Sequence, residues 1–266
     1  MERYEKYKDS GVEWIGPIPH NWEVNRLKYV VSINDEALPE TTKDDFEMEY
    51  VDISNVKSGI GIIATETYSF NKAPSRARRK VRDGDIIVST VRTYLKSISK
   101  IDNPPKNLIV STGFAVVRPT KMDSSFVGFL FYSEFLIGEI ISRSTGVSYP
   151  AINASEIGDI FIPIPKNEYQ TTIANYLDRK TAQIDKLIAQ KELLIELYEE
   201  EKTAIINQAV TKGIDPDVRL KHSGIDWLGE TPVGWEVKRL RYFTSYFKGN
   251  AFKSDISHSL VAIFLI

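Results

Sequence analysis

The sequence SGVEWIGPIPHNWEVNRLKYV at residues 10–30 returns as SGIDWLGETPVGWEVKRLRYF at residues 223–243. Eleven of the 21 aligned positions are identical, including the tryptophan pairs Trp14/Trp227 and Trp22/Trp235. The offset of 213 positions exceeds the about 20–50 residues of solenoid repeats, which indicates a duplicated module of domain size. Only 23 residues follow the second copy, so we expect residues 213–266 to be the incomplete start of a second module.

The composition is that of an ordinary globular protein, with 42% hydrophobic and 26% charged residues. The chain has no cysteine, which excludes disulfides, iron–sulfur clusters and cysteine-ligated zinc. No basic, apolar leader begins the sequence, and the longest apolar run, residues 260–266, is far shorter than the roughly 20 residues that cross a bilayer. We therefore expect a cytoplasmic protein without a membrane span.

Short apolar runs between turn residues predict strands in the first part of the chain. Residues 49–63 alternate and carry two glycines, which is typical of a strand, a turn and a second strand. An Asp-Gly-Asp turn precedes the apolar residues 86–88, which predict a buried strand. Residues 108–118 predict a further strand, interrupted at Gly113 and ended by Pro119.

A helix and a last strand complete the predicted globular domain. Residues 126–142 carry apolar side chains at helical spacing without an internal proline. Residues 160–165 (IFIPIP) are short, apolar and punctuated by proline, as in an edge strand. The prediction is an α+β domain over residues 1–166, in which helices pack on a mixed or antiparallel sheet.

One long helix is predicted to follow, over residues 167–212. Residues 168–210 contain neither glycine nor proline and repeat apolar side chains three or four positions apart. At 1.5 Å per residue such a helix reaches roughly 60 Å, too long for a small domain to cover, so we expect a coiled coil with a partner helix. The alternative is an amphipathic helix that folds back on its own domain. The expected interface residues are Leu177, Ile184, Leu187, Lys191, Leu194, Tyr198 and Ile205.

Together these features resemble the DNA-specificity subunit of Type I restriction-modification systems. Residues 163–177 (PIPKNEYQTTIANYL) are similar to the family's proline, Glu-x-Gln and Ile-Ala-x-Tyr-Leu junction. Residues 84–87 (GDII) and 145–150 (TGVSYP) are also similar to family sequences. The resemblance implies two target recognition domains, each followed by a long helix, with the two helices packed antiparallel as a spacer.

The resemblance also implies partners and the absence of catalysis in this chain. The partners would be double-stranded DNA, modification subunits that carry S-adenosylmethionine, and an ATP- and magnesium-dependent restriction subunit. The chain itself would hold no cofactor, no metal and no catalytic residue. Since the second domain is incomplete, we expect a homodimer through the long helix that reads a palindromic, bipartite site.

The charge distribution points to candidate DNA contacts. Net charge is −2, but residues 72–106 carry ten Lys or Arg against three Asp. Residues 73–80 are expected to form a loop that contacts phosphates, and residues 89–96 a loop in which Arg92 reads guanine. The alternative for each is a surface loop without a DNA role. The expected DNA-binding residues are Arg76, Arg78, Arg79, Lys80, Thr90, Arg92, Thr93, Tyr94, Lys96, Ser148 and Tyr149.

Other chemical signals are weaker. Residues 103–105 (NPP) are similar to the Asn-Pro-Pro-aromatic motif of amino-methyltransferases, but Lys106 replaces the aromatic residue and no glycine-rich cofactor loop precedes it. The histidines His20, His222 and His258 are isolated from one another, without metal-site spacing.

Two questions stay open in the sequence. One alternative to DNA recognition is a fragment that docks on modification subunits and competes with the full-length subunit, and another is a product that folds but has no activity. For the apolar end at residues 260–266, a frameshift or recombination end and a truncation are both open explanations.

Overall fold

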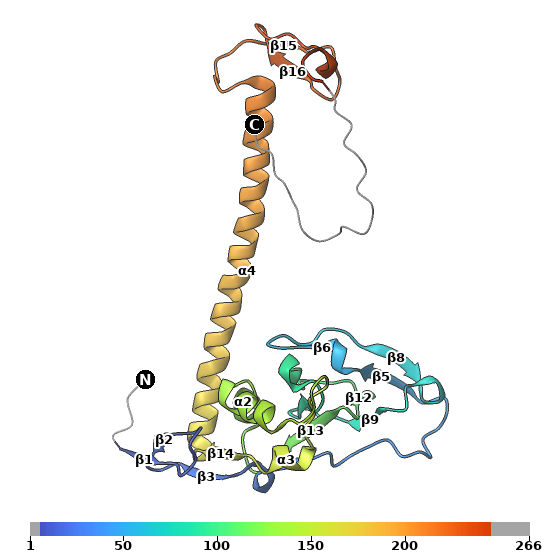
Figure 1. The fold of residues 1–266 in the computed structure, drawn as a ribbon, viewed down its shortest axis with the longest axis vertical. Helices are drawn as coiled ribbons and strands as arrows, with labels where there is room; N and C mark the ends of the chain where they lie inside the picture. Colours follow the sequence, from blue (N-terminus) through green and yellow to red (C-terminus); the bar gives the residue numbers. More distant parts are fainter. Residues whose placement is uncertain (1–5, 246–266) are drawn as a thin grey trace. The chain divides into compact units, whose positions relative to one another are not determined.

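The computed structural model describes residues 6–245 and divides into two compact units, residues 1–185 and 186–266 (Figure 1). The first contains two four-stranded sheets and three short helices, and the second contains the last part of a long helix and a hairpin. The α+β prediction is confirmed. The apolar end at residues 260–266 and His258 lie outside the described residues.

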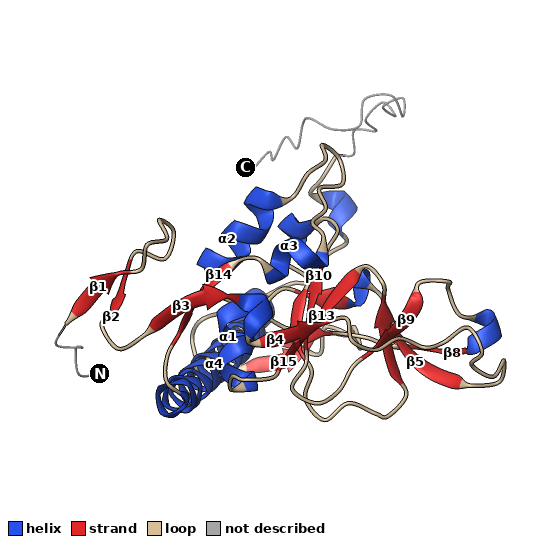
Figure 2. Cartoon of the chain, turned by 90° about the horizontal axis from the view of Figure 1, so that it is seen from below, coloured by secondary structure: helices blue, strands red, loops and turns tan. Residues whose placement is uncertain are grey.

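The first sheet is antiparallel throughout, in the order β11-β10-β13-β4. Its strands are β4 (Val31–Ile33), β10 (Ile86–Ser89), β11 (Ile98–Lys100) and β13 (Phe114–Pro119), of which β4, β10 and β13 are labelled in Figure 2. The central strand β10 is buried along its whole length, because both of its faces contribute side chains to the core. The predicted buried strand at residues 86–88 is therefore confirmed.

The second sheet is mixed, in the order β8-β5-β12-β9. Its strands are β5 (Glu47–Val51), β8 (Glu66–Ser69), β9 (Ala77–Lys80) and β12 (Leu108–Ser111). Strands β5 and β12 run parallel, and the other pairs are antiparallel. In the sequence, a two-stranded hairpin of β6 (Val56–Lys57) and β7 (Gly61–Ile62) lies between β5 and β8. Residues 49–63, where a strand, a turn and a second strand were expected, therefore contain most of β5 and both strands of this hairpin.

The single strand expected at residues 108–118 is wrong in one respect. The chain turns at Thr112 and Gly113, so that β12 belongs to the second sheet and β13 to the first. A Cβ atom on Gly113 would lie 2.6 Å from Cδ1 of Ile53, so a larger residue there would require the Ile53 side chain to move. The turn at Thr112 and Gly113 therefore carries the chain from one sheet to the other.

The single helix expected at residues 126–142 is also divided. Helix α1 (Ser124–Phe131) and helix α2 (Glu134–Arg143) meet at an angle of 61°. Ser133 causes the break, because its Oγ caps α2 by accepting from the Leu136 N–H and donates to the Leu130 carbonyl. Both helices and the short α3 (Ala154–Gly158) contribute to the core beneath the first sheet.

No single helix among residues 6–245 has the length and apolar character of a membrane span. Only α1 and α2, taken together across their bend, meet those two criteria.

A two-stranded sheet closes the first unit. Strand β3 (Glu23–Arg26) pairs antiparallel with β14 (Phe161–Ile164), which confirms the edge strand expected at residues 160–165. The 3₁₀ turn η1 (Leu27–Tyr29) follows β3 and buries Leu27 in the core. A hairpin of β1 (Tyr7–Asp9) and β2 (Pro17–Pro19) precedes it.

The predicted long helix is α4 (Asn167–Lys212), with 46 residues. Its first turns are anchored by Gln170, whose Oε1 accepts from the Asp123 N–H at 2.9 Å and whose Nε2 donates to the Pro165 carbonyl at 2.7 Å. Residues 178–208 are exposed.

The sequence repeat is also a structural repeat. The second unit contains a hairpin of β15 (Leu220–His222) and β16 (Glu230–Pro232), followed by the 3₁₀ turn η5 (Leu240–Tyr242). Each of these elements lies 213 positions after β1, β2 and η1. The hairpin registers also correspond, since Tyr7 lies opposite Pro19 and Leu220 opposite Pro232.

Candidate nucleic-acid interface

Three segments far apart in the sequence line one groove of about 740 Å³ in the first unit. They are the stretch from β5 to the β6–β7 turn, the residue before β9, and the loop that follows β10. A fourth segment, the loop that follows α2, contributes Tyr149. Three of the predicted DNA-binding residues, Arg76, Arg92 and Tyr149, lie together here. The full lining is Asp52, Ile53, Ser54, Val56, Lys57, Ser58, Arg76, Val91, Arg92, Leu95, Ser97 and Tyr149.

The loop after β10 has a strained backbone. Arg92 and Lys96 adopt left-handed conformations, with φ values of 50° and 52°, on either side of the 3₁₀ turn η4 (Thr93–Leu95). Residues other than glycine rarely take this conformation, and such strain persists only where the surroundings enforce it. The turn leaves Tyr94 and Leu95 exposed and sends Thr93 inward.

The loop after α2 holds Arg92 in place. The Arg92 N–H donates to the Pro150 carbonyl at 2.7 Å, and Val91 forms a bridge with Ala151. The Arg92 guanidinium carbon lies 4.6 Å from the ring centroid of Tyr149, which is a cation–π distance. The two loops that were predicted separately therefore form one structure.

Arg76 approaches the groove from the second sheet. Its Nη2 lies 2.5 Å from Oδ2 of Asp52, and its Nε donates to the Tyr50 hydroxyl at 3.2 Å. These partners raise the pKa of Arg76, first through the hydrogen bond to Tyr50 and then through the charge of Asp52. With Lys57 and Arg92, the groove carries three cationic side chains against one carboxylate.

The remaining predicted residues lie outside this groove. Arg78 stacks on the Phe70 ring at 4.6 Å, and Lys96 donates to both carboxylate oxygens of Glu134 at 3.0 Å. Lys80 lines a separate cavity of about 530 Å³, and Thr90 donates to the Gly113 carbonyl.

Three further predicted residues, Arg79, Tyr94 and Ser148, do not line the groove. Tyr94 and Ser148 are exposed and Arg79 is half-buried.

Two expectations about this region are corrected. Residues 73–80 are not one loop, because residues 77–80 form β9 and pair with β12 through a buried Ala77. Thr93 is only 4% exposed and its Oγ1 lies 2.8 Å from Oγ of Ser144, so its side chain fastens the loop to the end of α2 and is not presented to a ligand.

The β6–β7 hairpin also contributes to the groove, which the sequence did not predict. Lys57 and Ser58 lie at its turn, and they line the same groove as Arg92. The polar turn before Gly59 was the available signal, but nothing in its spacing places it beside Arg92.

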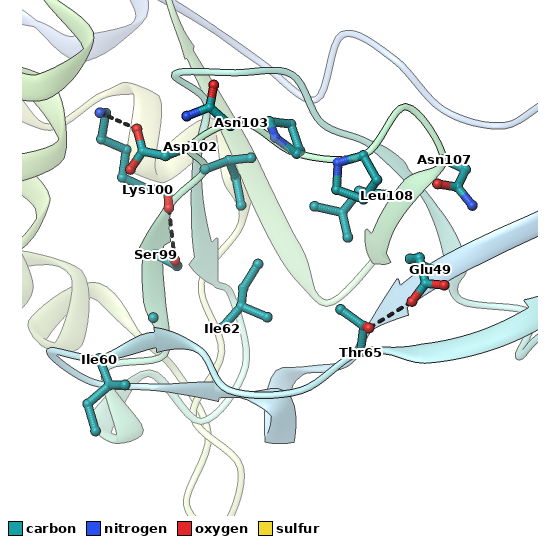
Figure 3. Close-up of a pocket in the computed structure, with 14 residues that line it drawn as sticks. Glu49, Ile60, Ile62, Thr65, Ser99, Lys100, Asp102, Asn103, Asn107 and Leu108 are labelled. Carbon is teal, nitrogen blue, oxygen red and sulfur yellow. Dashed lines mark hydrogen bonds and ion pairs between the residues drawn. The ribbon is translucent and has the colours of Figure 1, made fainter.

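A second cavity, of about 700 Å³, contains the Asn-Pro-Pro stretch at residues 103–105 (Figure 3). Its charged side chains form ion pairs or hydrogen bonds within the cavity. Lys100 Nζ lies 2.5 Å from Asp102, and Glu49 accepts a hydrogen bond from the Thr65 hydroxyl at 2.7 Å. This cavity therefore lacks the excess of cations found in the first groove. No group of three or more His, Cys, Asp or Glu side chains within residues 6–245 is arranged as a metal site.

The residues predicted for a helix–helix interface fall mostly on exposed parts of α4. Leu177 is half-buried near the start of the helix. The others recur three, four or seven positions apart and share one face. These exposed residues are Ile184, Leu187, Lys191, Leu194, Tyr198 and Ile205.

Comparison with known proteins assigns the family. The model of the Type I restriction modification DNA specificity domain matches residues 19–197, which include both sheets, the groove and α4 as far as residue 197. The chain belongs to this family. This specificity-domain chain is 30% identical over 209 residues to the Type I restriction enzyme MjaVIII specificity subunit of Methanocaldococcus jannaschii, covering 74% of the chain and 47% of that relative.

Two solved structures share the fold of the specificity-domain chain. One comes from a structural study of the assembly and conformational transition of a type I R-M system, with a TM-score of 0.62 and 28% identity over 78% of this chain and 55% of that one. The other is the HsdS subunit of Thermoanaerobacter tengcongensis, with a TM-score of 0.61 and 28% identity over 79% of this chain and 52% of that one. The specificity-domain chain spans about half the length of the curated relatives it matches.

Proposed function

We propose that this chain is a non-catalytic DNA-recognition subunit that seats one half-site of a bipartite target on the groove of Lys57, Arg76, Arg92 and Tyr149. The observation that supports it most is that one groove collects cations from three distant segments, with an aromatic ring and hydroxyl groups beside them. Phosphate contact needs such cations, and base readout needs a guanidinium and polar groups held in fixed positions.

The proposed roles follow from how each cation is held. Lys57 lies at a hairpin turn and Arg76 is exposed, so both suit phosphate oxygens. Arg92 is fixed by its backbone bond to Pro150 and by the ring of Tyr149, so its planar fork suits the O6 and N7 atoms of guanine. Tyr94 and Ser148, which are exposed on the same two loops, are proposed as flanking contacts.

The chain would direct partner subunits to the site it reads. Modification subunits would supply S-adenosylmethionine and methyl transfer, and a restriction subunit would supply ATP-driven cleavage. We further propose a homodimer through the exposed face of α4, which would place two recognition units on two half-sites related by two-fold symmetry.

A second candidate function uses the same exposed helix face. A chain that docks on modification subunits through α4 could compete with a full-length subunit without reading DNA. The family's partners and the exposure of that face support this alternative. The alternative gives the cationic groove no role.

Binding to a duplex library at several salt concentrations separates the two functions. For DNA recognition, affinity falls steeply with salt, and Lys57→Ala reduces the slope of log K against log salt by about 1. Arg92→Ala costs about 1–3 kcal/mol on the selected sequence and relaxes selectivity at one base pair. Arg219→Ala, an exposed arginine of the second unit, is the matched control. Salt-independent or absent binding, with modification subunits still bound, would favour the competitor.

A further inference from the structure

The chain carries two copies of one docking segment, and only one copy is docked among the described residues. The N-terminal copy is defined as residues 7–29 and the C-terminal copy as residues 220–242. Both form the same hairpin in the same register and end in the same 3₁₀ turn. The sequence repeat therefore preserves a structure, and the contacts of the first copy show what that structure binds.

The N-terminal copy holds the exit strand, defined as residues 159–164, which leads from the globular domain toward α4. Strand β3 pairs with β14 from Arg26 opposite Phe161 to Glu23 opposite Ile164. The Leu27 N–H donates to the Ile160 carbonyl at 2.9 Å, which continues the pairing into η1.

Charge and packing add to this backbone pairing. Asp159 lies 3.0 Å from the guanidinium of Arg26 and 2.7 Å from the ammonium of Lys28. The Arg26 guanidinium also lies 5.4 Å from the ring centroid of Phe161. Leu27 is fully buried, and Trp14 packs against the same core.

The C-terminal copy keeps the side chains that make these contacts. Glu236, Val237 and Arg239 stand where β3 has Glu23, Val24 and Arg26, and Leu240 and Arg241 stand where η1 has Leu27 and Lys28. Within the pairing strand only Asn25 is replaced, by Lys238.

The same side chains are uncovered in the C-terminal copy. Leu240 is 64% exposed, whereas its counterpart Leu27 is 0% exposed, and Trp227 is 84% exposed. Residues 236–239 form no strand, although β3 at the same place does. A groove of about 690 Å³ in the second unit is lined by Trp227, Trp235 and residues 236–240. This surface is therefore built for an exit strand that the described residues do not supply to it.

We propose that the C-terminal copy binds the exit strand of a second copy of this chain, in the register that β14 and β3 adopt, so that two chains exchange this strand. The occupant is chosen by complementarity: the exit strand carries the acid for Arg239 and Arg241, the ring for Arg239 and the backbone partners for residues 236–239. Exchange of an identical element is a low-cost route to association. The N-terminal copy lies in the same chain as that exit strand and competes with the C-terminal copy of the other chain for it. The fraction of exchanged chains therefore rises with protein concentration.

Site-directed cross-linking of the full chain tests this proposal, which does not rest on DNA binding. The chain has no cysteine, so Ile164→Cys with Glu236→Cys introduces only the two thiols wanted. Side chains directly opposite in an antiparallel pair have Cβ atoms about 5 Å apart, within reach of a short bis-maleimide. Equal amounts of unlabelled and nitrogen-15-labelled chain are mixed, cross-linked at high micromolar concentration and digested for mass spectrometry.

The proposal expects a peptide that joins residue 164 to residue 236 with mixed isotopes, in a yield that rises with protein concentration. Ile164→Cys with Glu23→Cys is the positive control and links within one chain, because those residues face each other across β14 and β3. Ile164→Cys with Glu230→Cys is the background control, since Glu230 corresponds to Pro17, which does not pair with the exit strand.

Two outcomes would overturn the proposal. One is a 164–236 yield no higher than the Glu230 background while the Glu23 control links fully. The other is a 164–236 product whose two halves always carry the same isotope, because the strand would then come from the same chain. Adding Arg239→Glu and Arg241→Glu must lower the mixed-isotope yield, since both charges would then repel Asp159, and an unchanged yield contradicts the assigned register.

Discussion

At the scale of single residues, Arg92 is held by both its backbone and its side chain. Its left-handed backbone, its bond to Pro150 and its stacking on Tyr149 all limit where the guanidinium can lie. A side chain that is already ordered loses less conformational entropy when it binds. Sequence reasoning selected Arg92 and Tyr149 separately from residue type, but their contact depends on a loop pairing that residue type does not encode.

Replacing Tyr149 tests this ordering. Tyr149→Leu removes a cation–π contact that contributes about 0.5–2 kcal/mol, so DNA affinity is expected to fall by a few-fold or more at constant salt. Tyr149→Phe keeps the ring and is the matched control, expected to bind as the parent does. Fluorescence anisotropy with a short duplex measures both. Equal affinities for the Leu and Phe variants would show that the ring does not position Arg92.

Asp85 and Arg118 form a buried ion pair that lies outside the groove. Asp85 is 1% exposed and accepts from Nε and Nη2 of Arg118 at 2.9 and 2.8 Å. The hydrogen bonds to Asp85 raise the pKa of Arg118. The Gly-Asp-Ile-Ile stretch, selected by family resemblance, therefore places its aspartate as the buried partner of an arginine.

Asp85→Asn is expected to destabilise the fold by about 1–3 kcal/mol, because it removes a buried acceptor of two Arg118 hydrogen bonds while Arg118 keeps its contacts with Glu36 and Asp35. Urea unfolding followed by circular dichroism measures the loss. Asp102→Asn, which breaks a more exposed pair with Lys100, should change stability by less than about 1 kcal/mol. Similar losses for both variants would mean that burial does not govern the strength of these pairs.

At the scale of whole elements, the sequence predicted which segments are strands and helices better than where they end. The boundaries failed at Gly113 and Ser133, where a tightly packed turn and a helix cap divide apolar runs that are continuous in the sequence. Strand β9 was missed because its run of basic residues, Arg78 to Lys80, has no alternation of apolar side chains. In each case tertiary contact outweighed the local pattern.

The exposed face of α4 makes a prediction about association. Leu187→Asp with Leu194→Asp puts two charges into the proposed helix–helix interface and is expected to convert dimer to monomer, as measured by light scattering. Leu193→Asp with Leu197→Asp is a matched control, because these leucines are also exposed but lie on another face of the same helix. Loss of the dimer in both variants, or in neither, would contradict an interface through Leu187 and Leu194.

Docking of the N-terminal copy makes a prediction about pH. Lys28 and Arg26 lower the pKa of Asp159 below its usual 3.8, the hydrogen bond to Lys28 being the largest cause. A lowered pKa contributes stability that is present above the unfolded value and is lost as the pH falls through the folded value.

Below about pH 4 the parent is therefore expected to lose stability more steeply than Asp159→Asn. Near neutral pH the difference between their free energies of unfolding is expected to stay constant. Denaturant midpoints across that pH range measure the effect. Parallel curves for the two proteins would show that these ion pairs do not help to hold β3 on the exit strand.

At the scale of the whole molecule, family and architecture could be predicted because a repeat, a junction motif and a long glycine-free helix are local in sequence. The composition of the groove could not, because Lys57 reaches it only through the way the two sheets and the β6–β7 hairpin come together. The asymmetry between the two copies was also hidden, since Leu27 and Leu240 are identical in sequence and differ only in what covers them.

The central claim is that one cationic groove, presented twice by a two-fold dimer, reads a palindromic bipartite DNA site. Mapping methylated positions in DNA exposed to this chain together with a modification subunit tests it most directly. The account predicts methylation at a symmetric, two-part sequence, lost or relaxed at one base pair in each half with Arg92→Ala and unchanged with Arg219→Ala. Methylation at an asymmetric site, at no defined site, or equally with Arg92→Ala would contradict it.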